Sequence, residues 1–92
     1  MKRIMRVKGE FILRKIAGDD VAVPIGQNIA DFNGAVLLNE TAVLLWKMLQ
    51  EGCTRESLKD SLCSEYGIDE RKAYEDVDKF LSVLEERGIL EE

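Results

Sequence analysis

Four successive apolar residues, Ala35, Val36, Leu37 and Leu38, run directly into an apolar helix pattern. An unbroken apolar run differs from the alternation of a strand with one wet face, so we expect a short strand that is covered on both faces. Asn39 stands where a helix N-cap belongs, because its side chain can accept a bond from a free N–H of the first turn. A strand of this kind with a bare edge offers backbone groups to which another chain can add itself.

Two further strand patterns precede this segment. They cover residues 11–16 (FILRKI) and 21–25 (VAVPI), and residues 17–20 (AGDD) between them have the composition of a hairpin link. We expect a loop over residues 26–34, followed by the third strand.

Three helix patterns follow the strands. The first, over residues 40–51, is apolar nearly all round and contains Trp46, as is typical of a buried helix. The second can be capped by Thr54 and extends through Tyr66. The third can be capped by Asp69 and extends to about residue 87, with apolar residues at three- and four-residue steps, and Gly88 with Ile89 behind it resembles a Schellman ending. This order predicts an α+β fold with three N-terminal β-strands before three α-helices, which is also the arrangement of a winged helix.

The composition indicates one folded domain. The chain has 92 residues, of which 46% are hydrophobic and 34% are charged, as in globular proteins with a single modest core. No apolar run approaches the ~20 residues of a membrane span, and the basic N-terminus lacks a signal-peptide core. We therefore expect a cytoplasmic protein with no membrane partner.

The charge is unevenly placed along the chain. The formal net charge is −5, although residues 1–15 contain six basic side chains and only one acidic one. We therefore divide the domain into a basic N-terminal arm, residues 1–9, and a folded body, residues 10–90. Two readings of the arm remain open. It is either a charged segment in solvent, or it docks on a neighbouring protein or on a second copy of this chain in a homodimer.

The residues that would carry catalysis are missing from the sequence. The chain has no His, no CxxC pair and no glycine-rich phosphate motif, which excludes His-based nucleophile systems and leaves too few ligands for zinc. Cys53 and Cys63 are ten positions apart, too far along a helix for a disulfide, so we expect free thiols. The prediction is a protein that is not an enzyme and has no catalytic residue, metal or cofactor.

The charge of the third helix argues against nucleic acid. Residues 69–87 contain four basic and seven acidic side chains, and a helix of that sign is repelled by the phosphate backbone. Nucleic acid is therefore not an expected partner, although winged-helix DNA binding and a generic protein-interaction module remain the alternative functions.

Several short segments have an order and spacing found together in one family. They are LNETAVLLW at 38–46, EG at 51–52, YGID at 66–69, DV at 76–77 and, after Leu84, RGIL at 87–90. In these segments the chain resembles the pyrroloquinoline quinone synthesis protein D family (PqqD-like), and the resemblance covers about residues 11–90.

The resemblance implies a winged-helix-like recognition element for ribosomally made, post-translationally modified peptides. It implies that the leader of a precursor peptide adds as a strand to the third strand and lies against the third helix. It also implies a partner enzyme, commonly of the radical S-adenosylmethionine type, to which the leader is presented, as by a peptide chaperone. Mapped onto this chain, the edge is residues 35–38.

The third helix supplies the wall of the predicted site. A helical wheel places an apolar shoulder beside the buried stripe, with both charge signs around it. The predicted wall residues are Lys72, Asp76, Lys79, Phe80 and Val83. Tyr74, on the opposite shoulder, is the competing choice.

Overall fold

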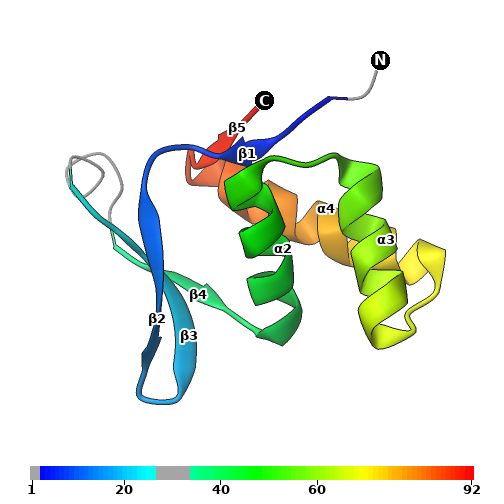
Figure 1. Cartoon of the computed structure of the whole chain (residues 1–92), viewed down its shortest axis with the longest axis horizontal. Helices are drawn as coiled ribbons and strands as arrows, with labels where there is room; N and C mark the ends of the chain where they lie inside the picture. Colours follow the sequence, from blue (N-terminus) through cyan, green and yellow to red (C-terminus); the bar gives the residue numbers. More distant parts are fainter. Residues whose placement is uncertain (1–2, 27–33) are drawn as a thin grey trace.

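The computed structural model describes residues 3–26 and 34–92. The expected strands are β2 (Phe11–Ile16), β3 (Asp19–Pro24) and β4 (Val36–Leu38), and the expected helices are α2 (Glu40–Glu51), α3 (Arg55–Tyr66) and α4 (Glu70–Glu86). Two short strands, β1 (Arg6–Val7) and β5 (Leu90–Glu91), are additional to the prediction. The predicted α+β fold, with strands before helices, is confirmed (Figure 1). Most of the expected loop, residues 27–33, lies outside the described residues.

Strands β2, β3 and β4 form an antiparallel sheet in that order. The hairpin between β2 and β3 is tighter than the predicted link of residues 17–20, because Ile16 already pairs with Asp19. Only Ala17 and Gly18 make the turn, with φ angles of 52° and 87°. Two successive positive φ angles are typical of a type I′ turn, whose twist matches the flanking strands. The second strand therefore begins at Asp19 and not at Val21.

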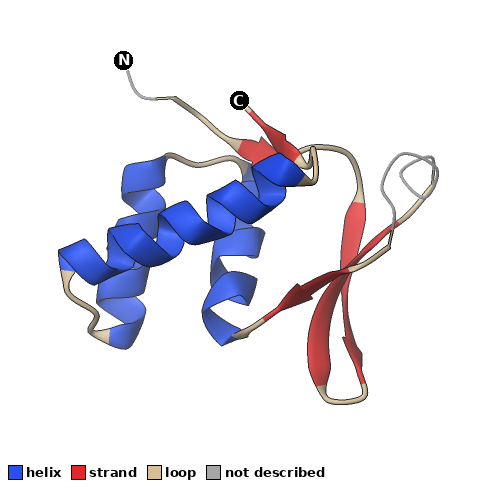
Figure 2. Ribbon diagram, turned by 180° about the vertical axis from the view of Figure 1, so that it is seen from behind, coloured by secondary structure: helices blue, strands red, loops and turns tan. Residues whose placement is uncertain are grey.

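The three helices enclose the core at one side of the sheet. In Figure 2, α4 lies across both α2 and α3, and the β2–β3 hairpin extends away from them. Trp46 of α2 is fully buried, and its ring meets that of Phe11 edge-on with 5.2 Å between the ring centres. This contact joins the sheet to the helical layer.

Side-chain caps fix where the helices begin. The Asn39 side chain accepts the Ala42 N–H at 2.8 Å, and the Asp69 carboxylate accepts the N–H of Lys72 at 2.9 Å. Thr54 makes a reciprocal capping box with Ser57. Because each side chain satisfies an N–H that the helix leaves unpaired, the three predicted starts are confirmed.

The end of α4 is also as predicted. Gly88 has a φ of 72° and donates its N–H to the carbonyl of Glu85, while Ile89 donates to that of Leu84. This is the Schellman pattern, and Ile89 is buried behind it. The motif turns the chain back so that β5 can pair with the N-terminal segment.

The N-terminal segment differs from the solvated arm considered for residues 1–9. Met5 and Val7 are only 5% and 8% exposed. Ile4, which precedes Met5, and Arg6, which lies between the two, are exposed. β1 pairs with β5, and the backbones of Met5 and Cys53 exchange two hydrogen bonds of 2.7 and 2.9 Å. Alternate side chains of an extended segment point to opposite sides, so the segment hides two apolar residues while its charged ones stay in water. Residues 5–7 are therefore packed into the domain and do not form the solvated arm considered for them.

The prediction that residues 35–38 are covered on both faces is also wrong. Val36 and Leu38 are buried, but Leu37 between them is 69% exposed and Ala35 is exposed as well. The helices cover one face of the sheet, and Val36 and Leu38 point toward them. An apolar run therefore does not show that a second layer exists, since a strand of three residues can leave one apolar side chain in water.

Candidate functional site

The outer edge of β4 is open in the described part of the chain. β4 pairs with β3 through Asp20, Val21 and Ala22, and no strand within residues 3–26 and 34–92 pairs with its other side. In an antiparallel ladder, successive residues direct their N–H and C=O groups to alternate sides. The edge therefore presents backbone groups either of Leu37 or of Val36 and Leu38.

A groove of about 310 Å³ lies directly after β4, between α2 and α4. It is lined by Asn39, Thr41, Ala42 and Leu45 from the start of α2, and by Asp76, Lys79, Phe80 and Val83 from α4. We call it the β4-side groove. At the opposite end of the strand, an Arg87 guanidinium N–H donates to the Ala35 carbonyl at 3.4 Å. Both ends of the segment 35–39 thus lie close to the second half of α4.

The β4-side groove has an apolar base and a charged rim. Ala42 and Leu45 are buried below it, Phe80 is half-buried, and Val83 is 43% exposed. An exposed branched apolar side chain at this position can be covered by a bound chain, which would remove apolar surface from water.

The charges at the rim are not equivalent. The Lys72 ammonium lies 3.0 Å from the Asp76 carboxylate one turn along α4, and this hydrogen bond raises the pKa of Lys72. Among the residues that the structure describes, Lys79 has no ion-pair partner. Asp76 is thus compensated within the helix, and Lys79 is left as the charge able to meet an acidic group.

The structure brings most of the predicted residues together. Four of the five predicted wall residues line the β4-side groove. Lys72 lies outside the groove and pairs with Asp76, which lines it. The four edge residues, 35–38, run beside the groove without lining it. Sequence reasoning missed the contribution of α2. The available signal was the pair Thr41 and Leu45, which are four residues apart and therefore share one face of the helix.

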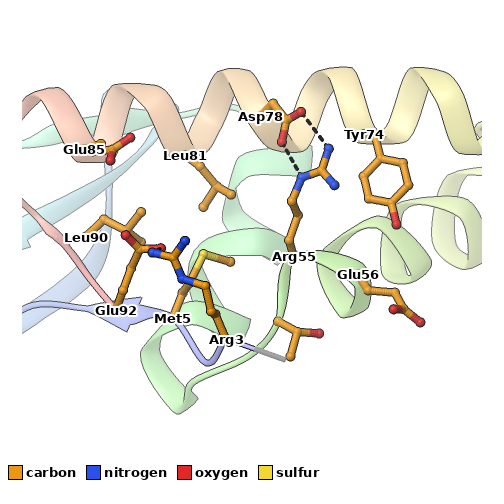
Figure 3. Close-up of a pocket in the computed structure, with 11 residues that line it drawn as sticks. Arg3, Met5, Arg55, Glu56, Tyr74, Asp78, Leu81, Glu85, Leu90 and Glu92 are labelled. Atoms are coloured by element: carbon orange, nitrogen blue, oxygen red, sulfur yellow. Dashed lines mark hydrogen bonds and ion pairs between the residues drawn. The ribbon is translucent and has the colours of Figure 1, made fainter. Parts of the chain in front are cut away.

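Tyr74, the competing choice, lies on the other flank of α4. It lines a second groove of about 480 Å³, formed with the start of α3 and the two chain ends (Figure 3). The guanidinium group of Arg55 lies 4.1 Å from the centre of the Tyr74 ring and binds both carboxylate oxygens of Asp78, at 2.7 and 2.9 Å. Tyr74 is therefore engaged by the chain's own cation, away from β4.

The fold and the β4-side groove define a class of protein: a small α+β domain in which, over the described residues, an open sheet edge ends beside a groove between two helices. The family model of the coenzyme PQQ synthesis protein D (PqqD) matches residues 21–90, which is more than half of the chain. The chain belongs to this family. Comparisons with curated proteins and with solved structures give no match.

Membership supports involvement in biosynthesis of the PQQ type, as a small accessory protein. The match begins at Val21 and so leaves out β1 and β2, although both strands contribute buried residues to the core. In the described chain, no helix is long and apolar enough to cross a bilayer. The same residues contain no cluster of three or more His, Cys, Asp or Glu side chains arranged to hold a metal ion.

Proposed function

We propose that this protein binds the leader segment of a ribosomally synthesised precursor peptide and presents it to a modifying enzyme, of the radical S-adenosylmethionine type. The observation that carries the proposal is the open edge of β4 next to the β4-side groove. The leader adds as a fourth strand beyond β4, and its side chains on one face enter the groove.

The dimensions suit a short peptide segment. The three residues of β4 offer about 10 Å of edge, and α4 rises about 15 Å from Asp76 to Glu86. Together they accommodate roughly five residues of an extended chain. Backbone hydrogen bonds supply affinity that does not depend on sequence, so discrimination between peptides comes from the side chains that enter the groove.

The chemistry of the groove favours an acidic and apolar leader. Phe80 and Val83 provide an apolar surface, and Lys79 provides a positive charge that forms no ion pair with a described residue of α4. A leader with alternating apolar and acidic residues would cover the first and pair with the second. An interaction of this size is transient, with an affinity near 1 μM, or about −8 kcal/mol.

Titration of the ¹⁵N-labelled protein with a synthetic leader peptide of alternating apolar and acidic residues tests this proposal. We expect chemical-shift changes at Val36, Leu37, Phe80 and Val83. Val83→Asp should weaken binding by tenfold or more, about 1.4 kcal/mol, because it places a negative charge on the apolar wall that meets an acidic peptide.

Ser82→Asp is the matched control. It adds the same charge one position away, at an exposed residue that does not line the groove, and should leave the affinity within about twofold. Equal losses in both variants, or shifts confined to α3, would contradict the proposed site.

A further inference from the structure

The second groove is built by four separate parts of the chain. α4 forms one wall, the first turn of α3 forms another, and the chain ends close the remaining side (Figure 3). Its lining residues are Arg3, Met5, Thr54, Arg55, Glu56, Tyr74, Asp78, Leu81, Glu85, Leu90 and Glu92.

The floor of the second groove is apolar. Met5 and Leu81 are buried, Leu90 is half-buried, and the three side chains point toward one another in Figure 3. An aliphatic chain laid across them would find apolar contact along its length. The floor is formed by residues from both ends of the chain and from α4, so it exists only because β1 pairs with β5.

The rim of the second groove is acidic. It carries four carboxylates, from Glu56, Asp78, Glu85 and Glu92, and two guanidinium groups, from Arg3 and Arg55. Both guanidinium groups are held by carboxylates of the same rim, because Arg55 binds Asp78 and Arg3 pairs with Glu92. Over the described lining residues the formal charge is therefore −2, and Arg3 and Arg55 are not available to an anion.

We propose that the second groove docks a basic segment of the modifying enzyme. The aliphatic stem of an arginine or lysine lies on the floor, and its charged end reaches Glu85 at the rim. This inference rests on the proposed function in naming the enzyme as the partner. The charge complementarity is what selects a basic partner over an acidic one, because like charges across an interface are costly.

The position of the second groove permits simultaneous binding. The β4-side groove is formed with Phe80 and Val83 of α4, and the second groove with Leu81 and Glu85 on the other flank of the same helix. A helix with its side chains is about 10 Å across. Leader and enzyme would therefore approach from opposite sides without competing for a residue.

Two blocked hexapeptides, GLRRLG and GLEELG, test the docking site. Titrated into the ¹⁵N-labelled protein at about 0.15 M salt, where the screening length is about 8 Å, GLRRLG should shift the signals of Tyr74, Leu81, Glu85 and Leu90, while GLEELG should not. Glu85→Gln should weaken GLRRLG by about fivefold, the effect of removing one favourable surface charge pair. Glu86→Gln, the same change at an exposed neighbour that lines neither groove, should leave binding within about 1.5-fold.

Several outcomes would overturn the docking site. One is equal binding of the two peptides; another is shifts at Val36–Leu38 instead of at the second groove. Concentration-dependent sedimentation that disappears in Glu85→Gln would show that a second copy occupies the groove. Binding of GLRRLG without binding of the leader would reject the proposed function and retain a basic docking site, whereas the converse would reject only the docking site.

Discussion

The two flanks of α4 are built from the same helix and differ in what faces them. On one flank, Phe80 and Val83 line the β4-side groove, which begins where β4 ends, and Lys79 is the charge without an ion-pair partner in the described chain. On the other flank, Asp78 is held by Arg55 in an arrangement of ion pairs over an apolar floor. On the first flank no described strand pairs with the outer edge of β4, and on the second the described carboxylates outnumber the guanidinium groups.

The difference shows that the residues on the buried face of a helix do not determine what its two flanks contact. Ala73, Val77 and Leu84 of α4 face the core and are fully buried. The flanking positions at three- and four-residue steps on either side then face quite different neighbours, the start of α2 on one side and the chain ends on the other. One helix can in this way present two grooves of different electrostatic character.

The largest expected effect comes from removing the floor of the second groove. Met5→Ala should lower the free energy of unfolding by about 2–4 kcal/mol, because it deletes most of a side chain that is only 5% exposed. Leader binding to the folded variant should remain, since Met5 does not line the β4-side groove. Urea denaturation followed by circular dichroism measures the loss.

Ile4→Ala is the control for Met5→Ala. Ile4 is the preceding residue and is 52% exposed, so its truncation should change the unfolding free energy by less than about 0.5 kcal/mol. If the two variants were equally stable, the N-terminal segment would not be packed against the domain, and the second groove would lose its floor.

A smaller effect distinguishes the two flanks through their helix caps. Asn39 caps α2 and lines the β4-side groove, while Thr54 caps α3 and lines the second groove. Replacing either residue with Ala should cost about 1 kcal/mol of stability, because one helix N–H loses its acceptor. Only Asn39→Ala should also weaken the leader in calorimetric titration. Equal weakening by Thr54→Ala would mean that the flanks do not act separately.

The smallest effect is the pH dependence of the Arg55–Asp78 pair. The hydrogen bonds from Arg55 lower the pKa of Asp78 from its ordinary value of 3.8. A carboxyl group with a lowered folded-state pKa adds stability above its unfolded pKa, and this stability is lost as the pH falls through the folded value. Because both side chains are about half exposed, the pair should contribute less than about 1 kcal/mol at neutral pH.

Asp78→Asn removes this titration. Thermal unfolding at pH 7 should show the variant slightly less stable than the parent, and the difference should shrink as the pH falls through the lowered pKa of Asp78 and vanish once the parent carboxyl is protonated as well. A difference that persists unchanged at low pH would mean that Asp78 acts through packing and not through its charge.

Local signals in the sequence were sufficient for much of the fold. The caps Asn39, Thr54 and Asp69 predicted the helix starts, and Gly88 followed by Ile89 predicted the Schellman ending, because each feature involves residues close in sequence. The three- and four-residue steps of α4 predicted its buried stripe, and a wheel then placed Phe80 and Val83 on the shoulder where the structure has a groove.

The features that the sequence did not predict depend on distant contacts. β1 and β5 have two residues each, too few for a periodic pattern, and each forms only because the other is present. The exposure of Leu37 depends on whether a second layer covers the sheet, and a run of four apolar residues does not specify this. The contribution of α2 to the β4-side groove likewise depends on how two helices pack.

The antiparallel pairing of β1 with β5 brings the two ends of the chain to one side of the molecule (Figure 1). A fluorophore, an affinity tag or a fused protein attached at either terminus therefore emerges near Arg3 and Glu92, beside the second groove. Such an attachment lies away from the β4-side groove, which neither chain end lines. It would instead hinder binding of a partner at the second groove.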